Sequence, residues 1–264
     1  MYLDINDSLN LKSGQIFEPD EVALVKKHIF PGSVVIDIGA NIGYYTLLFA
    51  QLVGFRGHVF AFEPEPANFS LLTKNVLLNK YNNVTLVPKA VASTNQRMKL
   101  FLCSESSGMH RLYPSLVCDQ SLNVDAVSLD SFLPLQHKKI DFIKMDIEGA
   151  EYMAMSGMRN IINKSSPKLI TEFSPAALFE SGTAPKKYLD LLLSYGYTIY
   201  DAREKPVNVK QLENDLKLFE QAMQEIFPNL NNQSMPETIQ NLSSQLIGYG
   251  YNRPLVENFL CVIK

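Results

Sequence analysis

The chain has 264 residues, enough for one large domain or two small ones. Hydrophobic residues make up 46% of it and charged residues 19%, a balance that excludes global disorder. The formal net charge of −3 implies no broad basic surface of the kind that binds nucleic acid. We therefore expect a folded protein whose partner is not a nucleic acid.

The cysteines and the first thirty residues bear on location. Cys103, Cys118 and Cys261 are odd in number and widely spaced, without a CxxC pair, which argues against a disulfide framework and a thiolate zinc site. The start of the chain lacks the basic and apolar stretches of a secretory signal. The longest apolar run, Tyr44 to Val53, is too short to span a membrane. These features predict a cytoplasmic protein without a membrane segment.

Apolar runs alternate with amphipathic stretches from residue 34 to about 200, which is typical of parallel strands joined by helices. The predicted strands are 34–38, 58–62, 83–87, 140–145, 168–173 and 197–201. The predicted helices begin near residues 42, 66, 149 and 188. This order indicates an α/β fold.

Two regions interrupt the alternation. Residues 97–130 lack helical periodicity and predict inserted strands and loops. Residues 204–252 contain two amphipathic stretches, Leu212 to Ile226 and Met235 to Leu246, which predict a helical insertion. Residues 256–264 predict a strand that closes the chain. We expect a single domain over 1–264, with an N-terminal segment and helix in 1–30. The insertion is either a lid over the substrate, or packing, or a homodimer contact.

The most informative motif is a glycine-containing turn between a buried strand and a helix. The turn has the sequence DIGANIG (37–43), in which every second residue is a candidate ligand contact: Asp37, Gly39, Asn41 and Gly43. Gly39 permits a close backbone approach to a ligand, and the following helix offers unpaired N–H groups to an anion. The same turn could serve packing alone, so it is only moderately specific.

An acidic residue at the end of the second strand adds to this motif. Glu63 lies 24 positions after Gly39, where a carboxylate can accept both hydroxyls of a ribose. A dinucleotide site needs a second glycine against the pyrophosphate, and this chain has Asn41 there, which disfavours NAD. S-adenosylmethionine has a ribose and a carboxylate but no phosphate, so the pattern fits it better.

The sequence resembles the FkbM-like family of class I S-adenosylmethionine-dependent methyltransferases. The matching segments are Glu18-Pro19, VIDIGANIGYYTL (35–47), FAFEPEPANFSLLTKNVLLN (60–79), VPKAVAS (87–93), VSLDSF (127–132), IDFIKMDIEGAE (140–151) and the closing ENFLCV. Residues 204–252 lie outside the resemblance. It implies a Rossmann-like sheet of seven strands in the order 3-2-1-4-5-7-6 with the last strand antiparallel.

The resemblance also implies a set of cofactor-binding residues. By carry-over, four residues of the turn would line the methionine end of the cofactor and Glu63 would hold its ribose, with Glu18 and Asp146 also at the cofactor. By their place after the third strand, Ala90 and Val91 would border the adenine. The turn residues are Asp37, Gly39, Asn41 and Gly43.

Three residues are candidates for catalysis. Asp146 follows the fourth strand of the sheet, at the edge where open α/β sheets bind ligands, and is the leading candidate for a base that takes the proton of a hydroxyl acceptor. His110, in a polar loop, is a second candidate, although a lone loop histidine is usually only solvated. Glu172 ends the fifth strand at the same sheet edge and could orient the acceptor. A divalent metal held by Asp146 and Glu172 is possible, but the usual amide ligand is missing, so no metal site is predicted.

The favoured function is therefore methyl transfer from S-adenosylmethionine to a hydroxyl of a small molecule, such as a sugar or secondary metabolite. One alternative is N-methylation, with Asp146 and Glu148 binding an ammonium group. The others are a nucleoside-binding module without turnover and a dinucleotide oxidoreductase. Binding of NAD alone would exclude the favoured function.

Overall fold

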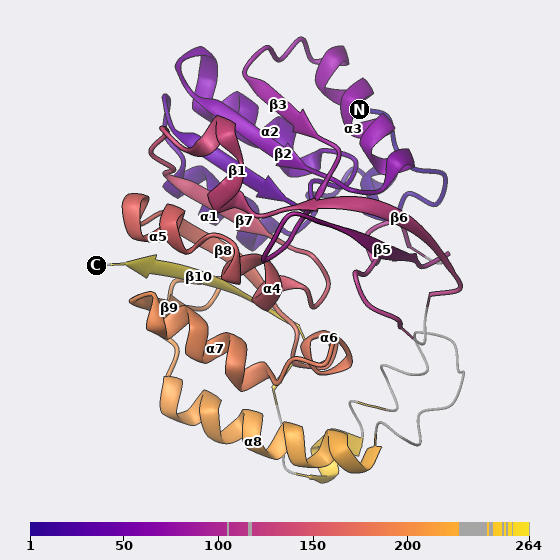
Figure 1. Cartoon of the computed structure of the whole chain (residues 1–264), viewed down its shortest axis with the longest axis vertical. Helices are drawn as coiled ribbons and strands as arrows, with labels where there is room; N and C mark the ends of the chain where they lie inside the picture. Colours follow the sequence, from indigo (N-terminus) through magenta and orange to yellow (C-terminus); the bar gives the residue numbers. More distant parts are fainter. Residues whose placement is uncertain are drawn as a thin grey trace.

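The computed structural model describes residues 1–104, 106–115, 118–226, 242, 245–249, 251, 253–254 and 256–263. Its centre is a seven-stranded sheet with helices on both faces (Figure 1). The strands of this sheet are β1 (Val34–Ile38), β2 (His58–Phe62), β3 (Val84–Val87), β7 (Phe142–Met145), β8 (Lys168–Phe173), β9 (Tyr197–Tyr200) and β10 (Glu257–Ile263). Six of them were predicted within the first 201 residues and the seventh at the end of the chain, so the predicted α/β fold is confirmed.

The strand order is β3-β2-β1-β7-β8-β10-β9. Numbered within this sheet alone, it reads 3-2-1-4-5-7-6. The first five strands of the row are parallel, whereas β10 pairs antiparallel with both β8 and β9. The closing strand of the chain thus lies inside the sheet, and the carboxyl ends of β1, β2, β7 and β8 share one edge.

The helices are α1 (Pro19–His28), α2 (Tyr44–Val53), α3 (Pro66–Leu78), α4 (Glu151–Ser156), α5 (Arg159–Ser165), α6 (Pro175–Glu180), α7 (Pro185–Ser194) and α8 (Val209–Ile226). Strand residues alternate between two cores, as a pleated sheet buried on both faces requires. Val35 and Val59 pack with apolar residues of α1 and α2. Ile36 and Phe60 pack on the other face with residues of α4, α5 and α7.

The inserted region forms a second, small sheet in the order β4-β6-β5, from β4 (Ala90–Val91), β5 (Gln96–Leu102) and β6 (Gln120–Val127). Strands β5 and β6 are antiparallel neighbours, and Leu102 pairs with Gln120. This pairing brings together the two ends of the segment between them. We call residues 103–118, without the undescribed 105, 116 and 117, the β5–β6 loop.

A disulfide joins Cys103 to Cys118 at the base of the β5–β6 loop. The sequence argument against disulfides is therefore wrong for this pair, and the argument from cysteines for a cytoplasmic location is removed with it. The expectation failed because a separation of fifteen residues looks wide in the sequence, whereas the antiparallel register of β5 and β6 closes it. Cys261 is a free, buried thiol in the core.

The late insertion is described in part. Helix α8 corresponds to the predicted stretch from Leu212 to Ile226 and buries its apolar face against α6 and α7. Most of the second predicted stretch, including Met235, lies outside the described residues. Among the helices that the structure describes, none is long and apolar enough to cross a membrane.

Candidate functional site

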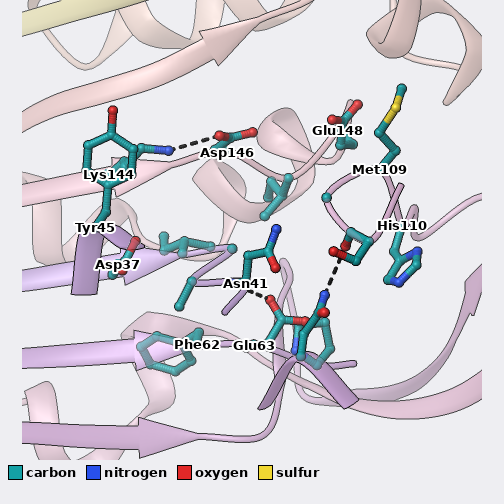
Figure 2. A pocket seen from close by; sticks show the side chains of 18 of the residues that line it. Asp37, Asn41, Tyr45, Phe62, Glu63, Met109, His110, Lys144, Asp146 and Glu148 are labelled. Atoms are coloured by element: carbon teal, nitrogen blue, oxygen red, sulfur yellow. Dashed lines mark hydrogen bonds and ion pairs between the residues drawn. The ribbon is translucent and has the colours of Figure 1, made fainter. Parts of the chain in front are cut away.

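A cavity of about 250 Å³ lies at the carboxyl ends of the parallel strands (Figure 2). Most of the residues predicted from the sequence line it, although they come from seven separate segments of the chain. They are Glu18, Asp37, Gly39, Asn41, Glu63, Ala90, Val91, His110, Asp146 and Glu172. The fold therefore brings the three catalytic candidates and all of the proposed cofactor residues except Gly43 into one site.

The turn after β1 is fixed by hydrogen bonds to the end of β2. The backbone N–H groups of Gly39 and Ala40 both donate to the carbonyl of Phe62. Gly39 has a φ of +82°, and a Cβ at this position would lie 2.0 Å from the carbonyl oxygen of Asp146. The residue must be glycine for two reasons, its backbone conformation and the close approach of the chain after β7.

We expect Gly39→Ala to lower the free energy of unfolding by about 3 kcal/mol, because a left-handed φ and a steric overlap act together. Urea unfolding measures this change. Gly196→Ala is the matched control, since Gly196 has a φ of +85° and open space around its Cβ position. It should cost only about 1 kcal/mol. Equal losses in the two variants would show that the chain near Asp146 moves aside without cost.

Gly43 was predicted at the cofactor, but it is not among the described residues that line the cavity. It is the N-cap of α2, with a φ of +97°. A Cβ there would lie 2.7 Å from Cδ1 of Leu72 in α3. The geometry thus indicates a packing role for Gly43, between α2 and α3, rather than contact with a ligand.

Glu63 is buried at the end of β2, with 5% of its surface exposed. Its carboxylate accepts from the backbone N–H of Asn41 at 2.9 Å and from that of Glu65 at 2.8 Å. A carboxylate has about four acceptor positions, so two remain for the hydroxyls of a ligand. Burial raises the pKa of Glu63 to about 7, against the effect of the two N–H donors.

Lys144 is the centre of a buried charge cluster that the sequence analysis did not include. It is 4% exposed, its Nζ lies 2.9 Å from Oδ2 of Asp146, and it stands 4.5 Å from the ring centroid of Tyr45. The Tyr45 hydroxyl donates to Glu18 at 2.9 Å and to Glu21 at 3.1 Å. We name Lys144, Asp146, Glu18, Glu21 and Asp37 the Lys144 cluster.

The carboxylates of the Lys144 cluster share one ammonium. Burial alone would lower the pKa of Lys144, but the surrounding carboxylates outweigh it and hold that pKa above its ordinary value. Burial raises the pKa of Glu21 to about 7 and that of Asp37 to about 6, and Lys144 opposes both shifts. Asp37 also accepts from the hydroxyl of Thr46 at 2.6 Å, which ties the end of β1 to α2. A lysine within the apolar strand IDFIKM was the signal that could have revealed this cluster.

Two further carboxylates lie beside Asp146. Oxygen atoms of Asp146, Glu148 and Glu172 fall within 4.8 Å of one another, at the carboxyl ends of β7 and β8. Oε2 of Glu148 lies 3.6 Å from Nη2 of Arg111, in the β5–β6 loop. Burial raises the pKa of Glu148 to about 7, with Asp146 adding to the shift and Arg111 opposing it.

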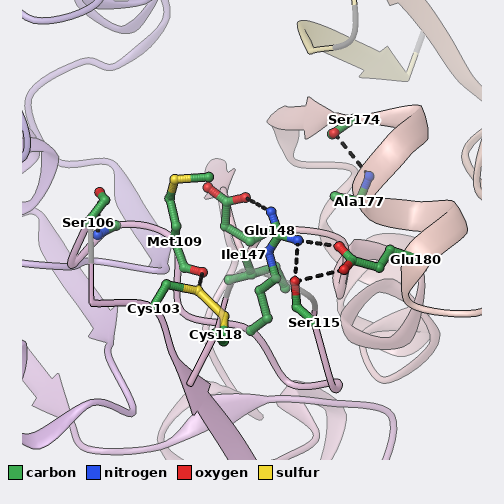
Figure 3. A network of polar contacts seen from close by, with 12 residues as sticks. Cys103, Ser106, Met109, Ser115, Cys118, Ile147, Glu148, Ser174, Ala177 and Glu180 are labelled. Carbon is green, nitrogen blue, oxygen red and sulfur yellow. Dashed lines mark hydrogen bonds and ion pairs between the residues drawn. A yellow bond between two sulfur atoms is a disulfide. The ribbon is translucent and has the colours of Figure 1, made fainter. Parts of the chain in front are cut away.

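Arg111 connects the β5–β6 loop to the rest of the site through its contacts with Glu148, Ser115 and Glu180, which are labelled in Figure 3. Its guanidinium forms an ion pair with Glu180 of α6 and donates to the hydroxyl of Ser115 at 3.0 Å. The hydroxyl of Tyr113 donates to the backbone carbonyl of Glu148 at 2.9 Å. The loop is thus fixed at its base by the disulfide and along its length by the chain after β7 and by α6.

His110 also belongs to the β5–β6 loop, and its ring lines the cavity. Nδ1 accepts from the backbone N–H of Cys103 at 3.2 Å. Burial lowers the pKa of His110, so the ring is neutral near pH 7, and its proton must then reside on Nε2. In this form the ring offers a hydrogen-bond donor to a ligand and has no free lone pair for a proton, which favours a binding role over that of a base.

The cavity is covered by two segments that contact each other. The backbone N–H and the hydroxyl of Ser107 both lie 3.2 Å from the hydroxyl of Ser8 in the N-terminal segment. Asn68 of α3 donates to the carbonyl of Ser107 at 2.9 Å. Ser8 and Ser107 both line the cavity. No periodicity or motif in the sequence marks this contact, because it joins residues 99 positions apart.

The family model of the methyltransferase FkbM domain matches residues 37–199 of this chain. The match begins at Asp37 and includes Glu63, His110, Asp146 and Glu172. It ends in β9, before α8.

Two relatives and one solved structure are similar to parts of this chain. The chain is 27% identical over 190 residues to 2-O-methyltransferase NoeI of Sinorhizobium fredii, covering 66% of this chain and 75% of that protein. It is 24% identical over 159 residues to hexuronic acid methyltransferase AglP of Haloferax volcanii, covering 55% of this chain and 58% of that protein. Among solved structures, methyltransferase FkbM from Methylobacillus flagellatus matches with a TM-score of 0.46 and 20% identity, over 75% of this chain and 44% of that one.

Proposed function

Because this chain belongs to the FkbM family of S-adenosylmethionine-dependent methyltransferases, we propose that it methylates a hydroxyl group of a small, polar acceptor such as a sugar or a hydroxylated secondary metabolite. The observation that carries the proposal is the shared cavity of Glu63 and Asp146, one at the proposed ribose end and the other beside the acceptor. The relatives support the choice of acceptor, since one is named a 2-O-methyltransferase and another a hexuronic acid methyltransferase.

The residues of the cavity fit the methyl donor. Glu63 keeps two acceptor positions for the ribose hydroxyls after its two backbone contacts. Oδ1 of Asn41 is buried without a hydrogen-bond partner among the described residues, so it can accept from the ammonium of the methionine end. Ala90 and Val91 offer an apolar surface for the adenine. When bound, the donor supplies a methyl group on a positively charged sulfur, which an oxygen nucleophile can take.

Asp146 is the proposed base. Its carboxylate has 36% of its side-chain surface exposed and accepts from the ammonium of Lys144, which holds it in its orientation. It can take the proton of the acceptor hydroxyl while the oxygen forms its new bond to carbon. His110 and Glu172 then serve to hold the acceptor in place. Positioning of this kind contributes much of the rate, because methyl transfer requires the oxygen to approach in line with the breaking bond.

The charges of the site support a reaction without a bound metal. Two of the three neighbouring carboxylates, Asp146 and Glu148, already have a cation of the chain beside them.

N-methylation is the second candidate function, because the acidic end of the cavity, where the acceptor is proposed to bind, also suits an ammonium group.

Calorimetric titration of the purified protein with S-adenosylmethionine and with NAD tests the proposal first. We expect saturable binding of S-adenosylmethionine and none of NAD. A screen of polyols, sugars and amines with methyl-labelled donor then tests the acceptor, and label should appear on hydroxylated compounds. Binding of NAD alone would contradict the proposed chemistry, and labelling of amines alone would select the second candidate.

A further inference from the structure

Three carboxylates meet at the acceptor end of the cavity, and they do not have equal surroundings. Asp146 has Nζ of Lys144 at 2.9 Å. Glu148 has Nη2 of Arg111 at 3.6 Å. Glu172 forms no ion pair with any residue that the structure describes. The two cations of the chain thus stabilise the charge on Asp146 and Glu148 and leave Glu172 without one.

The surroundings of Glu172 are unfavourable for a negative charge. Its Oε2 is buried and has no hydrogen-bond partner among the described residues. An ionised carboxylate in such a place would lose its hydration and gain no donor. The charged groups that act on it are Glu148, Asp146, Glu151, Lys144 and Arg111. Burial raises the pKa of Glu172 well above 4.5, and the neighbouring carboxylates add to the shift.

The backbone holds Glu172 in this position. It lies in β8, which pairs with β7 on one side and with β10 on the other, where Asn258 is opposite Glu172. The backbone of Glu172 cannot move away from the cluster without breaking the ladder to β10, and the preceding residue, Thr171, is also paired with β7. The cost of a third charge is therefore relieved by a proton on Glu172 rather than by movement of the backbone.

We propose that Glu172 works as a neutral carboxylic acid that donates a hydrogen bond to an oxygen of the acceptor next to the hydroxyl that is methylated. This inference rests on the proposed function. Asp146 takes the proton of the reacting hydroxyl, whereas Glu172 keeps its own proton throughout. Glu172 is thus a positioning residue. Asp146 accepts from the reacting hydroxyl, and Glu172 donates a hydrogen bond to the adjacent oxygen of the acceptor.

The division of roles defines a class of acceptor. A compound with neighbouring oxygens, such as a sugar with a vicinal diol or a hydroxyl beside an ether oxygen, satisfies both side chains. An ammonium group would face the proton of a neutral Glu172, so the three carboxyl groups would attract it less than three carboxylates would. A neutral Glu172 therefore favours O-methylation of polyoxygenated acceptors over N-methylation.

The first test needs neither cofactor nor acceptor. Urea unfolding of wild type and of Glu172→Gln is compared from about pH 5 to about pH 8. If Glu172 is neutral in the folded state and ionised in the unfolded chain, wild-type stability falls with rising pH above 4.5 until the pKa in the folded state is passed. Glutamine has no proton to lose, so Glu172→Gln should have the higher midpoint, and the gap should widen as the pH rises.

Glu257→Gln is the matched control. It makes the same chemical change in the neighbouring strand β10, where the carboxylate of Glu257 forms an ion pair with Nη2 of Arg253 at 2.7 Å, so its midpoint should lie at or below that of wild type. A midpoint of Glu172→Gln below wild type near neutral pH, or a gap that does not change with pH, would show that Glu172 is ionised and overturn the proposal. Stabilisation of wild type by Mg²⁺ that is lost in Glu172→Gln would overturn it as well.

The second test uses an acceptor found in the screen. Glu172→Leu should raise the KM for that acceptor about tenfold, as expected for one lost hydrogen bond, with a smaller change in kcat. Glu172→Gln should recover most of the loss, because its amide can donate in place of the acid. No recovery by glutamine would contradict the donor role. If wild type methylates no acceptor, the proposed function fails, while the unfolding series still decides the protonation of Glu172.

Discussion

Asp146→Asn should lower kcat about 10²- to 10⁴-fold, the range expected when a general base is removed. Asparagine has nearly the shape of aspartate, but it cannot take the proton of the acceptor hydroxyl. Its amide oxygen can still accept from Lys144, which limits the disturbance of the Lys144 cluster. Initial rates with methyl-labelled donor and a hydroxylated acceptor measure the change.

Asp141→Asn provides the control for this prediction. Asp141 lies just before β7, at the opposite end of the strand, and its carboxylate accepts from the backbone N–H of Val34 at 2.9 Å. The asparagine can keep that bond, so this variant should turn over at close to the wild-type rate. Near-normal turnover of Asp146→Asn, with a folded protein, would move the base to Glu148, the neighbouring carboxylate of the cavity.

Glu63→Ala should weaken the binding of S-adenosylmethionine at least about 100-fold, since hydrogen bonds to a charged acceptor contribute about 1.5–3 kcal/mol each and two are lost. Calorimetric titration measures the loss.

The affinity of wild type for S-adenosylmethionine should also fall as the pH is lowered through about 7, because protonation of Glu63 removes acceptor positions that the ribose hydroxyls need.

Glu65→Ala separates the ribose role from a structural one. Glu65 is the N-cap of α3 and accepts from the backbone N–H of Asn68 at 2.6 Å, but it is not among the described residues that line the cavity. Its loss should cost about 1 kcal/mol of stability and little affinity. Equal losses of affinity in the two variants would mean that Glu63 acts by holding the turn and not by binding the ribose.

The strands of the sheet were predictable because each is a short apolar run with a clear end. The runs VVIDI, HVFAF and KLITEF coincide with β1, β2 and β8. The site was predictable in outline for a related reason: Asp37, Glu63, Asp146 and Glu172 lie at or near the ends of parallel strands, and such ends meet at one edge of a sheet.

What sequence reasoning missed depends on contacts between distant segments. The disulfide follows from the register of β5 and β6, and the contact of Ser8 with Ser107 follows from the path of two loops. Neither leaves a periodic pattern. Lys144 was not among the predicted site residues, because its burial among the carboxylates of three segments becomes visible only when α1, β1 and β7 are side by side.

The shared ammonium of the Lys144 cluster has a consequence for the release of product. The cluster sets one buried cation against the carboxyl groups of Glu18, Glu21, Asp37 and Asp146, so its surroundings favour a positively charged ligand. The methyl donor carries a sulfonium charge that disappears when the methyl group leaves. We expect the demethylated product, which lacks this charge, to be attracted less strongly by the cluster than the donor is.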